Sequence, residues 1–289
     1  MTRNSKKLQP EPNEDFKKEK PTKQRQTPKP NSGSPFGISF VVPTEMVTLP
    51  SRGKYYPATS AVHGVEEVEV RHMTAKEEDL LSTVGGTDEK NIFDKLIDGV
   101  LINTSISSAD LLEEDKMAIL LTARITGYGA EYRVPLYCEA CTETREFLFD
   151  LSKNKIEDPP EDIEYDPESD TFSLTLPLTG IELKLLNFNK SHTAQIEEDR
   201  KRKEKLNISF NGTLAFLKKV TLSANGIEDP AQIAKLIEVL PAADAKTVKS
   251  FFENCRPRIN TEQEAPCTGC DSISLKEVPL SWAFFRTDI

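Results

Sequence analysis

The chain has 289 residues, 37% of them hydrophobic, and a formal net charge of −10. This length is enough for one large domain or two ordinary ones. It contains no apolar run of about 18 residues, so the sequence predicts no membrane-spanning helix and no membrane partner.

The charge is distributed unevenly. Residues 1–35 carry nine Lys or Arg against four acids, a charge of +5, which leaves 28 bases against 43 acids, or −15, for the rest. A broad nucleic-acid surface needs clustered Lys and Arg to replace counterions, so the acidic body argues against one.

The first residues, "MTRNSKKLQPEPNEDF", lack the apolar stretch of a secretory signal. We therefore expect a reducing cytoplasm, where the five cysteines serve as metal ligands or free thiols rather than disulfides. Residues 1–40 contain six prolines and few large apolar side chains, which predicts a disordered basic tail. Such a tail is either simply solvated or contacts an acidic partner or nucleic acid.

Residues 41–129 have the pattern of an N-terminal α+β region. Alternating valines predict a strand within 65–73, and Thr74 with Glu77 forms a capping-box pattern that predicts the start of a helix. Further helices are predicted over 87–103 and 113–129, the second of them buried because its middle is apolar nearly all round.

Two β-hairpins follow, at 132–151 and 172–186, where apolar residues alternate on both arms. Between them, residues 156–170 hold eight acids and predict an exposed loop. A calcium site there is conceivable, but the segment lacks the glycine and closing Glu of an EF-hand.

A helical segment is predicted over about 190–256. Residues 190–205 form a highly charged helix with acid-before-base pairs and no apolar stripe, so we interpret it as a solvated arm rather than a partner-binding helix. Helices are also predicted at 212–226, 229–240 and 244–255, and "WAFF" at 282–285 is predicted to form a final strand.

Two Cys-x-x-Cys pairs carry the clearest chemical signal. A tetrahedral Zn²⁺ site needs four soft ligands, and the pairs can supply all of them from two tight turns. The candidate metal ligands are Cys138, Cys141, Cys267 and Cys270. A closed shell leaves no coordination position for substrate, so the Zn²⁺ is predicted to be structural. Cys255 follows two phenylalanines on a helix and is predicted to lie in the core.

Other interpretations of the cysteines remain open. Each pair could be coincidental, or one could support thiol redox exchange, although neither precedes an obvious helix. A zinc-ribbon nucleic-acid-binding regulator is the alternative from another functional class. No catalytic motif is found, and the three histidines, His63, His72 and His192, are scattered. Arg71 and His72 end a strand, where capping or solvent exposure is favoured over a functional role.

The predicted fold class is therefore α+β: a helical N-terminal region plus zinc-ribbon-like β-hairpins with an inserted helical subdomain. The predicted organisation is a tail at 1–40, a region at 41–129, and a zinc-stapled region at 130–289 with its helical insertion at about 190–256.

Several segments, in this order, resemble the baseplate protein family of T-even-type contractile-tailed bacteriophages. They are "LPSRGKYYP", "VEVRHMTAKEEDLL", "LLEEDKMAILLTARITGYGAEYRV", the two cysteine pairs, "LPLTGIELKLL" and "VPLSWAFF", and they span about residues 45–286. The resemblance implies a non-enzymatic hub subunit or hub assembly chaperone. It also implies other baseplate hub proteins as partners, an oligomer within the baseplate as one arrangement, and a location in the host cytoplasm during assembly or in the virion tail. The family's paired cysteines correspond to the four candidate ligands.

Overall fold

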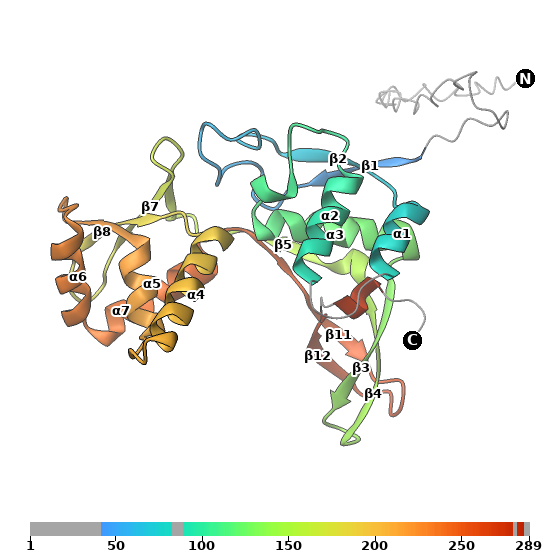
Figure 1. The fold of residues 1–289 in the computed structure, drawn as a ribbon. Helices are drawn as coiled ribbons and strands as arrows, with labels where there is room; N and C mark the ends of the chain where they lie inside the picture. The colour runs from blue at the N-terminus through green and yellow to red at the C-terminus, as the bar shows by residue number, and fades with distance from the viewer. Residues whose placement is uncertain (1–41, 83–88, 280–281, 286–289) are drawn as a thin grey trace, which may run out of the picture. The chain divides into compact units, whose positions relative to one another are not determined.

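The computed structural model describes residues 42–82, 89–279 and 282–285, so the predicted tail at 1–40 lies outside the described residues. The fold is mixed α+β, as predicted. Within this part of the chain there are seven α-helices and twelve short strands in small antiparallel sheets (Figure 1).

The N-terminal elements are a two-stranded sheet and three helices. Their bounds are β1 (Thr44–Thr48), β2 (Glu67–Arg71), α1 (Ala75–Ser82), α2 (Glu89–Val100) and α3 (Glu113–Tyr128). Val47 and Val68 lie opposite each other in the sheet and are buried, while charged neighbours face solvent. Helix α3 buries most of its central residues, which confirms the prediction of a buried helix.

Three further two-stranded sheets are also antiparallel. They pair β3 (Glu131–Cys138) with β4 (Glu143–Asp150), β5 (Lys155–Glu157) with β10 (Arg258–Asn260), and β11 (Glu262–Pro266) with β12 (Ile273–Glu277). In the β3–β4 hairpin, Tyr132 lies opposite Phe149 and Val134 opposite Phe147, all four buried. This alternation is the one predicted from the sequence.

The remaining elements form a four-stranded sheet with helices beside it (Figure 1). Its strands, in spatial order, are β6 (Glu164–Asp166), β7 (Thr171–Thr175), β8 (Glu182–Leu186) and β9 (Thr221–Ala224). The helices are α4 (Lys190–Lys205), α5 (Gly212–Val220), α6 (Pro230–Val239) and α7 (Ala242–Asn254). Three short 3-10 helices lie at Ser108–Asp110, Leu151–Lys153 and Trp282–Phe285.

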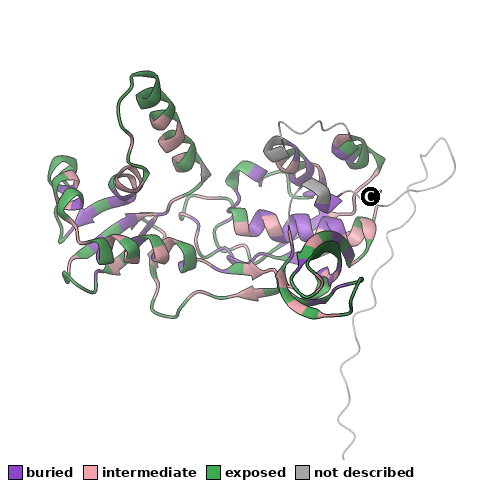
Figure 2. Ribbon diagram, turned by 90° about the horizontal axis from the view of Figure 1, so that it is seen from below, coloured by how far each residue is buried: buried purple, intermediate pink, exposed green. Residues whose placement is uncertain are grey.

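Buried apolar side chains gather into two clusters. The first core unites β1, β2, α2, α3 and the β3–β4 hairpin, and the second core unites β7, β8, α5, α6 and α7. Tyr55 packs against both, and its carbonyl oxygen accepts a hydrogen bond from Asn187 Nδ2 at 3.1 Å. Figure 2 shows the buried residues concentrated on the central helix and strands, with exposed faces on the outer helices.

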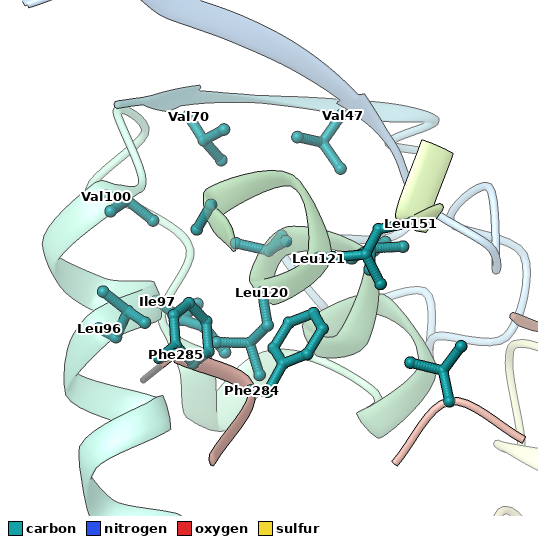
Figure 3. Close-up of a cluster of buried hydrophobic side chains, with 14 of the residues drawn as sticks. Val47, Val70, Leu96, Ile97, Val100, Leu120, Leu121, Leu151, Phe284 and Phe285 are labelled. Atoms are coloured by element: carbon teal, nitrogen blue, oxygen red, sulfur yellow. The ribbon is translucent and has the colours of Figure 1, made fainter. Parts of the chain in front are cut away.

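The C-terminal aromatic segment differs from its prediction. Residues 282–285 form a 3-10 helix, not a strand. Successive residues of a strand point to opposite faces, yet Phe284 and Phe285 both point into the first core, near Leu120 and Ile97 (Figure 3). The carbonyl oxygen of Phe284 also accepts a hydrogen bond from the buried Arg124 Nε at 2.8 Å.

The helix predicted at 212–226 is too long. Helix α5 ends at Val220, and the next residues form β9, which pairs with β8. The β-branched side chains of Val220 and Thr221 favour this change from helix to strand, and the edge of β8 supplies the hydrogen-bond partners.

The start of α1 is fixed by a buried ion pair. Glu77 is 2% exposed and accepts hydrogen bonds from Arg71 Nη2 at 2.7 Å and from the Thr74 backbone N–H at 3.0 Å. Burial by itself would raise the pKa of Glu77, but the bonds from Arg71 and Thr74 outweigh it and lower the pKa to about 2. Arg71 therefore has a structural role in tying β2 to α1.

This pair gives a prediction on stability and pH. The folded-state pKa of Glu77 lies below its ordinary value of 4.5, so its contribution is present above pH 4.5 and is lost as the pH falls toward about 2. We expect Glu77→Gln to destabilise the fold by about 3 kcal/mol at pH 7, lowering the Tm by about 5–10 °C. The measurement is the Tm of variant and parent across this pH range, with the exposed Glu69→Gln as control. A Tm difference that does not shrink with falling pH would contradict the assignment.

Candidate metal centre

The two cysteine pairs lie at the tips of two different hairpins. Cys138 is the last residue of β3, and Cys141 lies in the turn before β4. Cys267 follows the last residue of β11, and Cys270 lies in the turn before β12. Each hairpin thus presents two sulfurs from one short turn.

The two turns share an unusual backbone conformation. The residue directly after the second cysteine has a positive φ in both, 56° at Thr142 and 55° at Asp271. Left-handed residues of this kind reverse the chain sharply, and they are uncommon outside glycine. The repeated conformation shows that the two pairs are equivalent turns, which the sequence spacing alone does not show.

Direct contacts join the two hairpins. The backbone N–H and the hydroxyl of Thr268 both donate to the Glu146 carbonyl oxygen, each at 3.0 Å. Cys267 also forms an antiparallel bridge with Phe147 of β4. The second turn is therefore aligned against β4, and this places its cysteines beside those of the first turn.

The four predicted ligands come together. The Sγ atoms of Cys138, Cys141, Cys267 and Cys270 all lie within 4.8 Å of one another, and Cys138 Sγ is 3.8 Å from Cys270 Sγ. Four sulfurs at about 2.3 Å from a central ion, in a tetrahedron, are separated by about 3.8 Å. Cys138 and Cys267 are buried, Cys141 is half-buried and Cys270 is exposed. The residues thus fit a tetrahedral metal ion in position and in donor type.

The electrostatics of the thiols favour the same interpretation. The backbone N–H of Cys141 donates a hydrogen bond to the Cys138 sulfur and lowers the pKa of Cys138 to about 7. The Ser272 N–H acts in the same direction on Cys270, but desolvation and the three neighbouring sulfurs outweigh it and raise the pKa of Cys270 to about 12. Four thiolates this close repel one another unless a cation lies between them, so a bound metal ion would stabilise all four in the charged form.

No other cysteine or histidine in the described ranges joins this cluster. Cys255 lies in the second core, fully buried, which confirms its predicted position. His63 Nδ1 is 2.9 Å from the Tyr56 carbonyl oxygen, and His192 Nδ1 accepts the Asn189 N–H in the cap of α4. Each has a local structural partner, and burial lowers the pKa of His192.

Sequence reasoning did not identify the supports of the cluster. Lys276 Nζ lies 5.8 Å from the centre of the Phe147 ring and 3.8 Å from Glu139 Oε1 in the first turn. This cation links β12 to the first hairpin beside a cluster of potential thiolates. Lys276 belongs to no recognisable sequence motif, so only the folded structure shows that it contacts the first hairpin.

Taken together, the fold is an α+β scaffold in which distant hairpins meet at a four-cysteine cluster. A family model described as T4 bacteriophage base plate protein matches residues 42–279, most of the chain. The chain belongs to this family, and its role is therefore connected with the phage tail baseplate. Neither the curated proteins nor the solved structures include a match to this chain. Among the described helices, none combines the length and apolar character needed to cross a membrane.

The cluster predicts metal content and a metal-dependent stability. We expect one Zn²⁺ per chain by elemental analysis, and loss of that metal in Cys138→Ser and Cys267→Ser. Zinc binding to small Cys sites contributes about 10–16 kcal/mol, so losing even a few kcal/mol of it should lower the Tm by at least about 10 °C.

Cys255→Ala is the matched control for this experiment. It removes a buried thiol far from the cluster in the second core, so the metal content should stay at one per chain. A cluster variant that keeps the full metal content would contradict the assignment, as would a purified chain that binds no Zn²⁺.

Proposed function

We propose that this chain acts without enzymatic activity in building the hub of the phage baseplate, as a structural subunit or an assembly chaperone, through protein–protein contacts. The observation that carries the proposal is the family match over residues 42–279. The order and identity of the segments that resemble hub proteins support the narrower assignment. The structural character of the family supports a role other than catalysis.

The proposed cofactor is a structural Zn²⁺ held by Cys138, Cys141, Cys267 and Cys270. When bound, the ion supplies a crosslink and no reactive position, because four protein sulfurs complete a tetrahedral shell. The hairpins would then form a zinc-ribbon-like unit within residues 130–289, with the helical segment at about 190–256 inserted between the pairs. Residues 41–129 would form the N-terminal α+β region that packs on it.

The body of the chain offers little support for the nucleic-acid-binding alternative. Residues 36–289 carry 28 Lys or Arg against 43 acids, a charge of −15. A phosphate backbone is repelled by such a surface unless the cations are clustered. We therefore keep protein partners, and other baseplate hub proteins in particular, as the proposed ligands.

The test is purification of the tagged full-length chain from infected cells. We expect phage baseplate hub proteins to co-purify with it, because the proposed role consists of contacts with them. The double variant Cys138→Ser/Cys267→Ser should lose these partners if the zinc crosslink holds the contact surface, whereas Cys255→Ala should retain them. Co-purification of nucleic acid without any baseplate protein would contradict the proposal.

Mass spectrometry of purified virions separates the two forms of the role. A structural subunit is present at a fixed ratio to other baseplate proteins, whereas a chaperone dissociates and is absent from finished particles. Presence at a ratio that varies between preparations would fit neither form.

A further inference from the structure

Helix α4 ends in an exposed apolar and basic tip. Every residue from Lys201 to Ser209 is exposed, including two large apolar side chains, Leu206 at 64% and Ile208 at 51%. Side chains of this size scattered singly are normal, but here two lie within three residues at the end of a polar helix. We define the tip as residues 201–208.

Two of the four cations on the tip already contact other side chains, and one of these is Lys203, whose Nζ lies 5.5 Å from the centre of the Phe210 ring. Arg200 is bound to Glu197 and Glu204, and Arg202 to Asp199, within the helix itself. Lys201 and Lys205 take part in no ion pair among the described residues. The tip therefore presents the ammonium groups of Lys201 and Lys205, without a salt bridge, in the same exposed segment as two apolar side chains, a combination that suits an acidic surface with an apolar floor.

A groove of about 530 Å³ elsewhere on the chain has this complementary character. Its floor includes Tyr55, Ile163 and Tyr165, with Pro159 and Pro160 beside them. The rings of Tyr55 and Tyr165 lie 5.7 Å apart, centre to centre, and both are only half-buried. Half-exposed aromatic rings beside prolines form a surface on which an apolar side chain can be buried.

One side of the groove is formed by an acidic segment, although the groove lining as a whole has two acids, Asp158 and Glu161, and two cations, Arg52 and Lys54. Residues 156–170 contain eight acids and no Lys or Arg, and Glu161 lines the groove itself. Glu161, Asp162 and Glu164 are exposed and take part in no ion pair in the described ranges. Of the two cations at the groove, Arg52 is already bound to Asp158 at 3.2 Å. Lys54 remains to offset the charge of these carboxylates.

The tip of α4 cannot fill the groove of its own chain. The helix begins beside the groove, because two hydrogen bonds hold the residues just before it there. Asn187 Nδ2 donates to the carbonyl oxygen of the groove residue Tyr55. Arg256, next to the groove residue Pro257, donates to the Phe188 carbonyl oxygen. Sixteen helical residues at about 1.5 Å each then carry the tip about 24 Å away from that start. An intact helix thus holds tip and groove apart within one molecule.

We propose that the α4 tip of one copy docks into the acidic, aromatic groove of a second copy. Leu206 and Ile208 contact the floor of Tyr55, Ile163 and Tyr165, while Lys201 and Lys205 pair with the carboxylates of 161–164. The two surfaces differ, so the contact is head-to-tail, and repeating it gives a ring or an open chain of subunits. This inference concerns two surfaces of the same chain and does not depend on the proposed hub function.

The expected interaction is weak and sensitive to salt. The gain from burying two aliphatic side chains is of the same order as the cost of the freedom lost on association. The lysine–carboxylate pairs add attraction that salt screens, since the Debye length falls from about 10 Å at 0.1 M to about 3 Å at 1 M. Self-association should therefore appear at high protein concentration and diminish as salt is added.

The test is analytical ultracentrifugation of the purified zinc-loaded chain over a range of concentrations. We expect Lys201→Glu/Lys205→Glu to raise the dissociation constant by at least about tenfold, because it replaces attraction by repulsion at the groove. The control, Lys235→Glu/Lys246→Glu, makes the same change of charge on exposed lysines of α6 and α7 and should leave the constant unchanged. Circular dichroism checks that each variant is folded.

The head-to-tail geometry is tested by mixing. The groove variant Glu161→Lys/Asp162→Lys should also fail to self-associate, yet an equal mixture with the tip variant should form dimers, because each pair retains one intact groove and one intact tip. A chain that carries both double changes has an acidic tip and a basic groove. These charges attract each other again, so this chain should self-associate. A parent chain that stays monomeric at every concentration overturns the proposal, as does self-association that these variants leave unaffected.

Discussion

The structure depends on one long-range constraint, the meeting of four sulfurs from two hairpins. Cys138 and Cys270 are 132 positions apart in sequence, yet their Sγ atoms are 3.8 Å apart. The Thr268 contacts with Glu146 and the bridge between Cys267 and Phe147 align the hairpins, so the cluster is also part of the first core. A crosslink at this point would add a bond between two chain segments that already meet through hydrogen bonds and core packing.

The elements between the cysteine pairs form a second core of their own. A folded insertion brings its two ends back to fixed positions, so closing the long loop between the pairs requires little further ordering. Tyr55 and Asn187 connect this second core to the N-terminal elements through packing and a hydrogen bond. The arrangement leaves helix α4 and the acidic segment 156–170 available on the surface, where contacts with other proteins can form.

The parts of the fold that depend on local sequence patterns could be predicted. The alternation in 132–151, the capping pair Thr74 and Glu77, and the buried Cys255 all follow from residue type and spacing. The errors arise where tertiary contacts decide the outcome. Phe284 and Phe285 form a 3-10 helix because both rings enter one core, and residues after Val220 leave the helix because they pair with the edge of β8. The proximity of the two cysteine pairs was a hypothesis from chemistry, and their equivalent turns at Thr142 and Asp271 carry no sequence signal.

Membership of the T4 base plate family connects this chain with the phage baseplate, and the four-cysteine cluster is where the proposed metal crosslink would lie. One metal ion is proposed to join both hairpins. X-ray absorption spectroscopy at the zinc edge of the purified chain tests it most directly, because it reports the number and type of ligand atoms. An ion that joins both hairpins should give a single shell of four sulfurs at about 2.3 Å. A shell with fewer than four sulfurs, completed by nitrogen or oxygen, would contradict it.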